Sequence, residues 1–190
     1  RFADAYIDAL EYIIGLNRQG TRIVEEFASI LLRRLLTPFS DGFVDLQSPT
    51  GAGRQCVIYN HDGSAYVSDE ARMLAEAGDK SFLMGNVLTD SPADIFESGI
   101  VKSLSSARLE SMPDCRECAF VVYCGSDPIR LHAEGRQPDA EAGSTGCRQR
   151  EPVFEHLFSR ILDGDEATLD IFWAWITSRR LSDISIWDRP

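Results

Sequence analysis

The amino-acid sequence predicts an α+β fold, in which a small β-hairpin and a cysteine-rich loop are flanked by N- and C-terminal α-helices. Apolar residues recur at helical spacing near both ends of the 190-residue chain, within residues 2–35 and 154–176. Between them, a β-rich stretch at 55–68 contains the pair Asp62-Gly63, which is typical of a hairpin turn. Four of the five cysteines follow this hairpin, between residues 115 and 147.

Composition narrows the classes of function. The net charge of −11 argues against non-specific binding to nucleic acid or to an anionic membrane, because both need a basic surface. No apolar run approaches the ~18 residues of a membrane-spanning helix. The cysteine count is odd, and enough apolar residues are present for a core, so a secreted disulfide framework is disfavoured. We therefore expect a cytoplasmic location.

Two helices are expected at the N-terminal end. The first carries an apolar stripe within residues 2–14 and ends at Gly20, and Thr21 is expected to cap the second, which ends before Pro38. The chain begins inside a helical pattern, with neither an initiator Met nor a signal-peptide pattern, so we expect a fragment of a longer protein. The expected segments are 1–38, the helical end of a preceding domain or linker helices; 39–150, the cysteine-containing domain; and 151–190, the C-terminal helices.

Turn and capping residues define the middle of the chain. Residues 39–55 are expected to form a loop, because they contain a proline and several glycines. Ser91, Pro92 and Asp94 indicate a helix start, and this helix is expected to extend to about Leu109 with a break near Gly99.

The remaining segments alternate between helix and loop. A short helix is expected at 127–134, followed by a polar loop to Gly146. Two apolar stripes, separated at Asp163-Gly164, predict C-terminal helices whose aromatic residues belong to a core rather than to a cofactor site.

The cysteine spacing predicts a metal site. Cys115, Cys118 and Cys124 have the pattern C-x2-C-x5-C, and Cys147 follows after 22 intervening residues. A two-residue gap lets both sulfurs of a Cys-x2-Cys turn face one metal centre. Four thiolates are the ligand set of a closed zinc site or of a [4Fe–4S] cluster, and the spacing does not distinguish the two.

This cysteine pattern, placed after a strand–Asp-Gly–strand hairpin, resembles a SPASM domain. That domain is the C-terminal auxiliary-cluster domain of radical S-adenosylmethionine (SAM) enzymes that modify peptides and proteins. Residues 59–63, 68–74 and 124–128 resemble more closely the His-Xaa-Ser system radical SAM maturases. The resemblance covers about residues 40–150, so residues 39–150 are expected to form a SPASM-like auxiliary cluster domain.

The chain departs from the full SPASM pattern at two positions. Cys56 and Gly63 match the start of the pattern, but Ser68 and Pro128 stand where two further cysteines are expected. The resemblance therefore implies one [4Fe–4S] cluster rather than two, held by Cys115, Cys118, Cys124 and Cys147. We expect Cys56 to be a buried, inert thiol in a strand rather than a ligand, because a cysteine packs as a small apolar side chain.

The resemblance also implies a function. The chain is expected to be the auxiliary domain of a radical SAM enzyme that modifies a ribosomally made peptide or protein, with the cluster serving electron transfer, structure or both. The C-x3-C-x2-C motif of the SAM-cleaving cluster is absent from the sequence, so this chain should not be active alone. S-adenosylmethionine and that second cluster are expected in an N-terminal radical SAM barrel of the parent chain, and residues 1–38 are expected to be the helical end of this barrel or linker helices. The expected partners are this barrel, a precursor peptide and a protein reductant.

A structural zinc site is an alternative that the sequence leaves open. Zinc accepts four cysteines at such spacings and would fold the loop outright, so the chain could be a structural zinc-binding interaction module without catalysis.

Asp69 is the candidate catalytic residue. In some related maturases an Asp directly follows the hairpin cysteine and accepts a proton from the substrate, and Asp69 follows Ser68 in the matching place. The alternative is a helix-start carboxylate paired with Arg72. The three histidines show no metal-binding spacing and are expected to be surface or packing residues: His61, His132 and His156.

Overall fold

The computed structural model describes residues 2–184, and it divides the chain into two compact units. Residues 1–41 and 145–190 form one unit, called here the helical unit, and residues 42–144 form the other, the sheet unit. The described residues are rich in helix and include a small antiparallel sheet, as the α+β prediction requires. The N- and C-terminal helical segments, which the sequence treats as separate, therefore belong to one unit.

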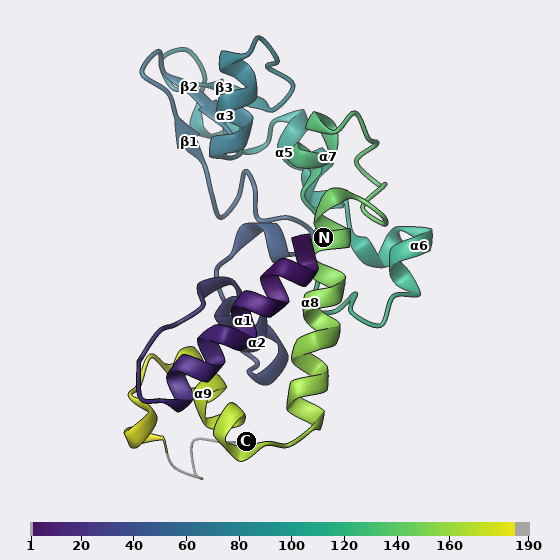
Figure 1. The fold of residues 1–190 in the computed structure, drawn as a ribbon. Coiled ribbons are helices and arrows are strands. Elements are labelled where there is room, and N and C mark those ends of the chain that lie inside the picture. Colours follow the sequence, from purple (N-terminus) through teal and green to yellow (C-terminus); the bar gives the residue numbers. More distant parts are fainter. Residues whose placement is uncertain (1, 185–190) are drawn as a thin grey trace. The chain divides into compact units, whose positions relative to one another are not determined.

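The helical unit packs four helices around an apolar core. They are α1 (Phe2–Arg18), α2 (Glu26–Leu36), α8 (Thr145–Leu162) and α9 (Glu166–Thr177), followed by the short 3-10 helix η3 (Leu181–Asp183). Figure 1 shows α1 beside α8, and both α1 and α2 also contact α9. Several buried core residues belong to the predicted apolar stripes: Leu10, Ile14, Leu31, Phe154, Leu157 and Phe172. Others lie beside these stripes and were not predicted: Leu32, Val153, Ile171 and Trp175.

The start of α2 differs from the prediction that Thr21 caps it. The helix begins at Glu26, and the Glu25 carboxylate caps it by accepting a hydrogen bond from the Ala28 backbone N–H at 2.5 Å. Burial raises the pKa of Tyr6, whose hydroxyl also donates to this carboxylate. Residues 21–25 form no helix, and the buried Asn17 side chain holds this loop to the end of α1 by donating to the backbone carbonyls of Ile13 and Ile23.

The sheet unit contains the predicted hairpin and one further strand. Strands β1 (Ile58–Tyr59) and β2 (Ser64–Tyr66) pair antiparallel, and β3 (Leu83–Asn86) pairs with β2, giving the order β1-β2-β3. Gly63 in the connecting turn has a φ of 84°, a conformation that glycine adopts at low cost. The hairpin is thus confirmed, whereas β3 was not expected.

Short helices cover the sheet and complete this unit. Those that contact the sheet are α3 (Asp69–Glu76), α4 (Pro92–Phe96) and α5 (Gly99–Ser106), and the others are α6 (Pro113–Arg116), α7 (Pro128–Ala133) and the 3-10 helices η1 (Val44–Leu46) and η2 (Leu109–Ser111). The predicted capping at Ser91 is confirmed as a reciprocal capping box with Asp94. The break between α4 and α5 also falls where the sequence indicates, as does the short helix α7.

Among the described residues, the structure contains no helix with both the length and the apolar character needed to cross a membrane.

Candidate cysteine centre

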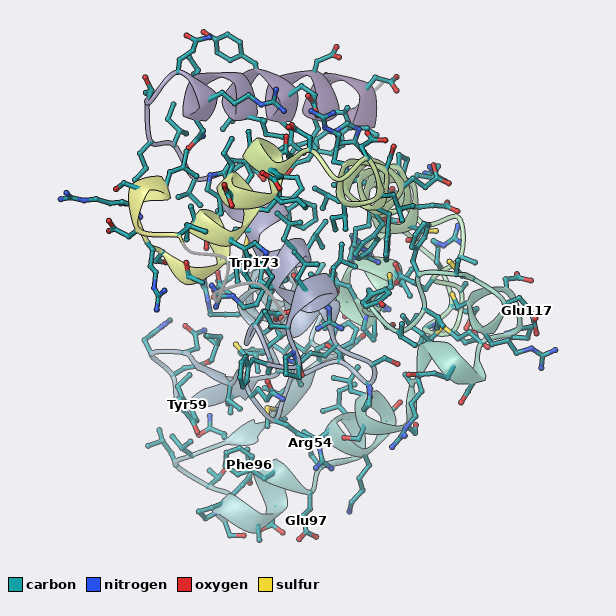
Figure 2. The ribbon with its side chains drawn as sticks, turned by 90° about the horizontal axis from the view of Figure 1, so that it is seen from below. Arg54, Tyr59, Phe96, Glu97, Glu117 and Trp173 are labelled. Carbon is teal, nitrogen blue, oxygen red and sulfur yellow. The ribbon has the colours of Figure 1, made fainter. Side chains whose placement is uncertain are left out.

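The segment that carries Cys115 and Cys118 is a tight turn. Pro113 begins α6, and the buried Cys115 lies within this helix. The backbone N–H of Cys118 donates to the Cys115 carbonyl at 3.0 Å, which folds the Cys-x2-Cys segment back on itself. Figure 2 shows Glu117, which lies between the two cysteines, at the outer edge of the ribbon, and 78% of its side chain is exposed.

Cys124 returns to the same part of the sheet unit. Its backbone N–H donates to the Phe120 carbonyl at 3.0 Å. Its side chain packs against a small apolar cluster of Leu109, Met112 and Cys115, to which Val121 and Ala142 also contribute. Two of the predicted ligand residues, Cys115 and Cys124, therefore lie on one small core.

Gly125 anchors this segment on η1. A Cβ added to Gly125 would lie 2.2 Å from the Cα of Leu46 and 2.4 Å from the Asp45 carbonyl oxygen. Because both are backbone atoms, only glycine fits here. The backbone N–H of Ser126 adds a hydrogen bond to the Gln47 carbonyl at 3.2 Å. The Cys124-Gly125 pair is thus held directly against the loop that precedes the hairpin.

Cys147 belongs to the helical unit, where it lies in the first turn of α8. The sequence predicts a polar loop as far as Gly146, but α8 already begins at Thr145. Within residues 2–184, no group of three or more His, Cys, Asp or Glu side chains is arranged so that it could hold a metal ion. The four-cysteine ligand set therefore stays a prediction.

The two positions where the SPASM pattern expects further cysteines are both helix starts. Ser68 is buried and caps α3 by accepting a hydrogen bond from the Ala71 N–H at 3.2 Å. Pro128 occupies the first position of α7, which Asp127 caps by accepting from the Arg130 N–H at 3.0 Å. Serine and proline are favoured at these helix positions, so each residue has a local structural role.

Cys56 is partly exposed and lies before β1, in an isolated bridge to Ala52, so the expectation of a buried thiol within a strand is wrong. Burial raises the pKa of its thiol, and the negative charges of Glu70, Asp45 and Asp69 raise it further. A raised pKa lowers the fraction of thiolate, which is the form that reacts and binds metal.

Asp69 lies in the first turn of α3, immediately after the cap. Its carboxylate accepts a hydrogen bond from the Arg72 guanidinium at 2.9 Å, and 56% of its side chain is exposed. This ion pair is the one that the structural alternative expects. No observation tests the catalytic role of Asp69, which stays a prediction.

Each histidine has a neighbour that suits a surface or packing role. The His132 ring lies 2.6 Å from the Asp79 carboxylate and packs edge-on against Phe82. His156 lies 2.8 Å from the Glu11 carboxylate, within the helical unit. His61 is exposed in the hairpin turn.

Sequence reasoning missed an apolar groove in the sheet unit. It has a volume of ≈ 380 Å³ and lies between α3 and α7, lined by Glu70, Met73, Leu74, Ile129, Arg130 and Ala133. The one sequence feature that could have indicated this groove is the apolar Met73-Leu74 pair near a charged helix start. Such pairs are common where helices pack, so this pair alone predicts no ligand site.

Comparisons with family models, with curated proteins and with solved structures gave no match. The function is therefore argued from the residues of this chain.

Proposed function

We propose that the chain is an auxiliary-cluster domain of a radical SAM enzyme that modifies a peptide or protein, and that it binds one [4Fe–4S] cluster. The proposed ligands are Cys115, Cys118, Cys124 and Cys147. The observation that carries the proposal is the packing of Cys115 and Cys124 on one apolar core, after an antiparallel hairpin with an Asp-Gly turn. This is the order of elements on which the resemblance to SPASM domains rests.

The donor set suits this group. Four thiols give the ligation of a [4Fe–4S] cluster, and the apolar cluster around Cys115 and Cys124 limits access of water to these two sulfurs. The Cys-x2-Cys turn and the Gly125 anchor fix the backbone of the segments that carry Cys115, Cys118 and Cys124. Metal binding would contribute directly to folding, because a complete ligand set exists only in the folded chain.

The roles of Ser68 and Pro128 support a count of one cluster. Both positions serve helix starts, and Cys56 alone supplies a single thiol of raised pKa near three carboxylates. A second cluster would lack most of its cysteine ligands. The chain thus has the hairpin but uses these two positions for helix starts, Ser68 as a cap and Pro128 as a first helical residue.

When bound, a [4Fe–4S] cluster supplies one-electron transfer or stabilises the loop. With four cysteine ligands no iron is left open, so direct ligation of the substrate is disfavoured. Within this chain, Asp69 is the candidate for holding a proton at its carboxylate as a peptide radical is oxidised. The precursor peptide, the barrel of the parent chain and a protein reductant are the proposed partners.

Cysteine variants test the ligand assignment. Cys118→Ser or Cys147→Ser in the 190-residue chain should abolish stoichiometric metal binding after anaerobic reconstitution, and the loss should be accompanied by reduced protection of residues 112–150 in hydrogen exchange. The matched control is Cys56→Ser, which should retain the full metal content. Equal metal loss from Cys56→Ser would contradict the assignment.

A further inference from the structure

A cavity in the helical unit is separate from the cysteine residues and has an unusual lining. Its volume is ≈ 370 Å³, within the range of about 300–1,000 Å³ found for small-molecule pockets. It lies where α1, the loop after it, the end of α9 and η3 meet. Its lining includes three arginines and no carboxylate: Asn17, Gly20, Arg22, Ala174, Trp175, Arg179, Arg180, Leu181 and Ser182. In a chain of net charge −11, such a concentration of positive charge requires an explanation.

Helix capping explains part of this charge. Arginines near a helix C-terminus hydrogen-bond its last carbonyls and interact favourably with its dipole. Arg22 donates to the Ser178 carbonyl at 3.0 Å, and Arg33, outside the cavity, donates to the Ile176 carbonyl at 3.2 Å. These two residues account for the capping of α9. The side chain of Arg180 makes no hydrogen bond or ion pair with any residue that the structure describes, so capping does not explain it.

Trp175 provides an independent observation. It is 2% exposed and lines the cavity, yet its indole Nε1 is buried without an acceptor among the described residues. Buried polar groups in folded proteins are nearly always hydrogen-bonded, and an unsatisfied donor costs free energy. A buried donor on the wall of a cavity indicates an acceptor that is not among the residues that the structure describes.

The backbone around the cavity is held in place on both sides. Asn17 fixes the loop that carries Arg22, through its hydrogen bonds to Ile13 and Ile23. Ser178 adopts a φ of 57°, an uncommon conformation for a residue other than glycine, and this turn directs the chain from α9 into Arg179 and Arg180. Arg22, on the loop held by Asn17, donates to the Ser178 carbonyl, and Arg179 and Arg180 follow that turn.

We propose that this cavity binds an organic anion, with a carboxylate or phosphate at Arg180 and an apolar group against Ala174 and Trp175. Guanidinium groups match both anions through paired hydrogen bonds, and Trp175 supplies an apolar wall and one donor. The site requires neither a metal nor any cysteine, so its test is independent of the cluster proposal.

Nuclear magnetic resonance titration of the 190-residue chain tests this site. The probes are phenyl phosphate, phenylacetate and the neutral 2-phenylethanol, and the observable is the indole N–H resonance of Trp175, assigned with Trp175→Phe. At least one anion should shift this resonance saturably, and the neutral compound should not. An absence of saturable shifts with both anions, or an equal response to 2-phenylethanol, would overturn the proposal.

A pair of charge-matched variants locates the binding. Arg180→Gln should weaken binding of the anion about tenfold or more, because a charge-assisted hydrogen bond is lost, and should leave the melting temperature unchanged. The control Arg54→Gln removes one positive charge from the sheet unit, where Arg54 bonds to Ser105, and should leave the affinity unchanged. Equal weakening by both variants would mean that net charge alone attracts the anion, which would overturn the site.

Discussion

At the scale of single residues, Ser68 caps a helix at a position where the SPASM pattern expects a cysteine ligand. Its hydroxyl accepts the Ala71 N–H, and the residue is buried. Ser68→Ala should lower the free energy of unfolding by about 0.5–2 kcal/mol, the usual cost of a lost cap. Urea denaturation measures this change. The control is Ser103→Ala on the exposed face of α5, which should change stability by less than about 0.5 kcal/mol; an equal loss in both would contradict the capping role.

Asp69 is tested by separating stability from chemistry. Its pair with Arg72 is exposed, and such pairs contribute only about 0–1 kcal/mol, so Asp69→Asn should barely change the melting temperature. In the proposed radical SAM parent enzyme the variant should still cleave S-adenosylmethionine and bind its peptide, while product formation in a single turnover falls by about 10²–10⁴-fold. Normal product yield would show that Asp69 is not the proton acceptor.

Asp79 connects the segment after α3 to His132 in α7, and its carboxylate makes the stability of the folded chain depend on pH. The hydrogen bond from the Ser81 hydroxyl, followed by that with His132, lowers its pKa to about 2 from the ordinary 3.8. A lowered folded-state pKa stabilises the protein above the unfolded value, and this stabilisation is lost as the pH falls from 3.8 through about 2. The stability difference between wild type and Asp79→Asn should therefore shrink over that window, as urea denaturation at several pH values can measure. A difference that stays constant would contradict this role.

At the scale of elements, the close approach of Gly125 to η1 fixes the segment that follows Cys124. Gly125→Ala would place a Cβ 2.2 Å from a backbone atom of Leu46, so we expect a loss of stability of at least about 1–3 kcal/mol and a lower metal content after reconstitution. Gly99→Ala is the control, since nothing lies within 4 Å of the added Cβ. Equal effects of the two variants on melting temperature would contradict the anchoring.

Elements with strong local signals could be predicted from the sequence. The apolar stripes give α1, α8 and α9, and the Asp62-Gly63 turn gives the hairpin. The predicted start of α2 was wrong because the Glu25 carboxylate caps the helix in place of Thr21. This carboxylate also accepts a hydrogen bond from Tyr6, which is distant in the sequence. Strand β3 was missed because four residues with an internal Gly85 carry little β signal, and their pairing depends on β2.

At the scale of the whole molecule, the sequence shows which residue types suit a site but not what completes it. The cysteine spacing predicts a metal site, and the packing of Cys115 with Cys124 agrees with a shared location for two of its thiols. The groove between α3 and α7 and the arginine-lined cavity could not be predicted, because each gathers residues from segments far apart in the sequence. Such sites depend on tertiary packing that no local pattern encodes.

The central claim is that this chain holds a single iron–sulfur cluster, and its iron and acid-labile sulfide content tests it most directly. Anaerobic reconstitution of the 190-residue chain should give about four irons and four sulfides per chain, with brown colour that dithionite bleaches. A colourless protein with one tightly bound zinc and no sulfide would contradict the claim and favour a structural zinc site. A content near eight of each, as two [4Fe–4S] clusters would give, would contradict the single-cluster count.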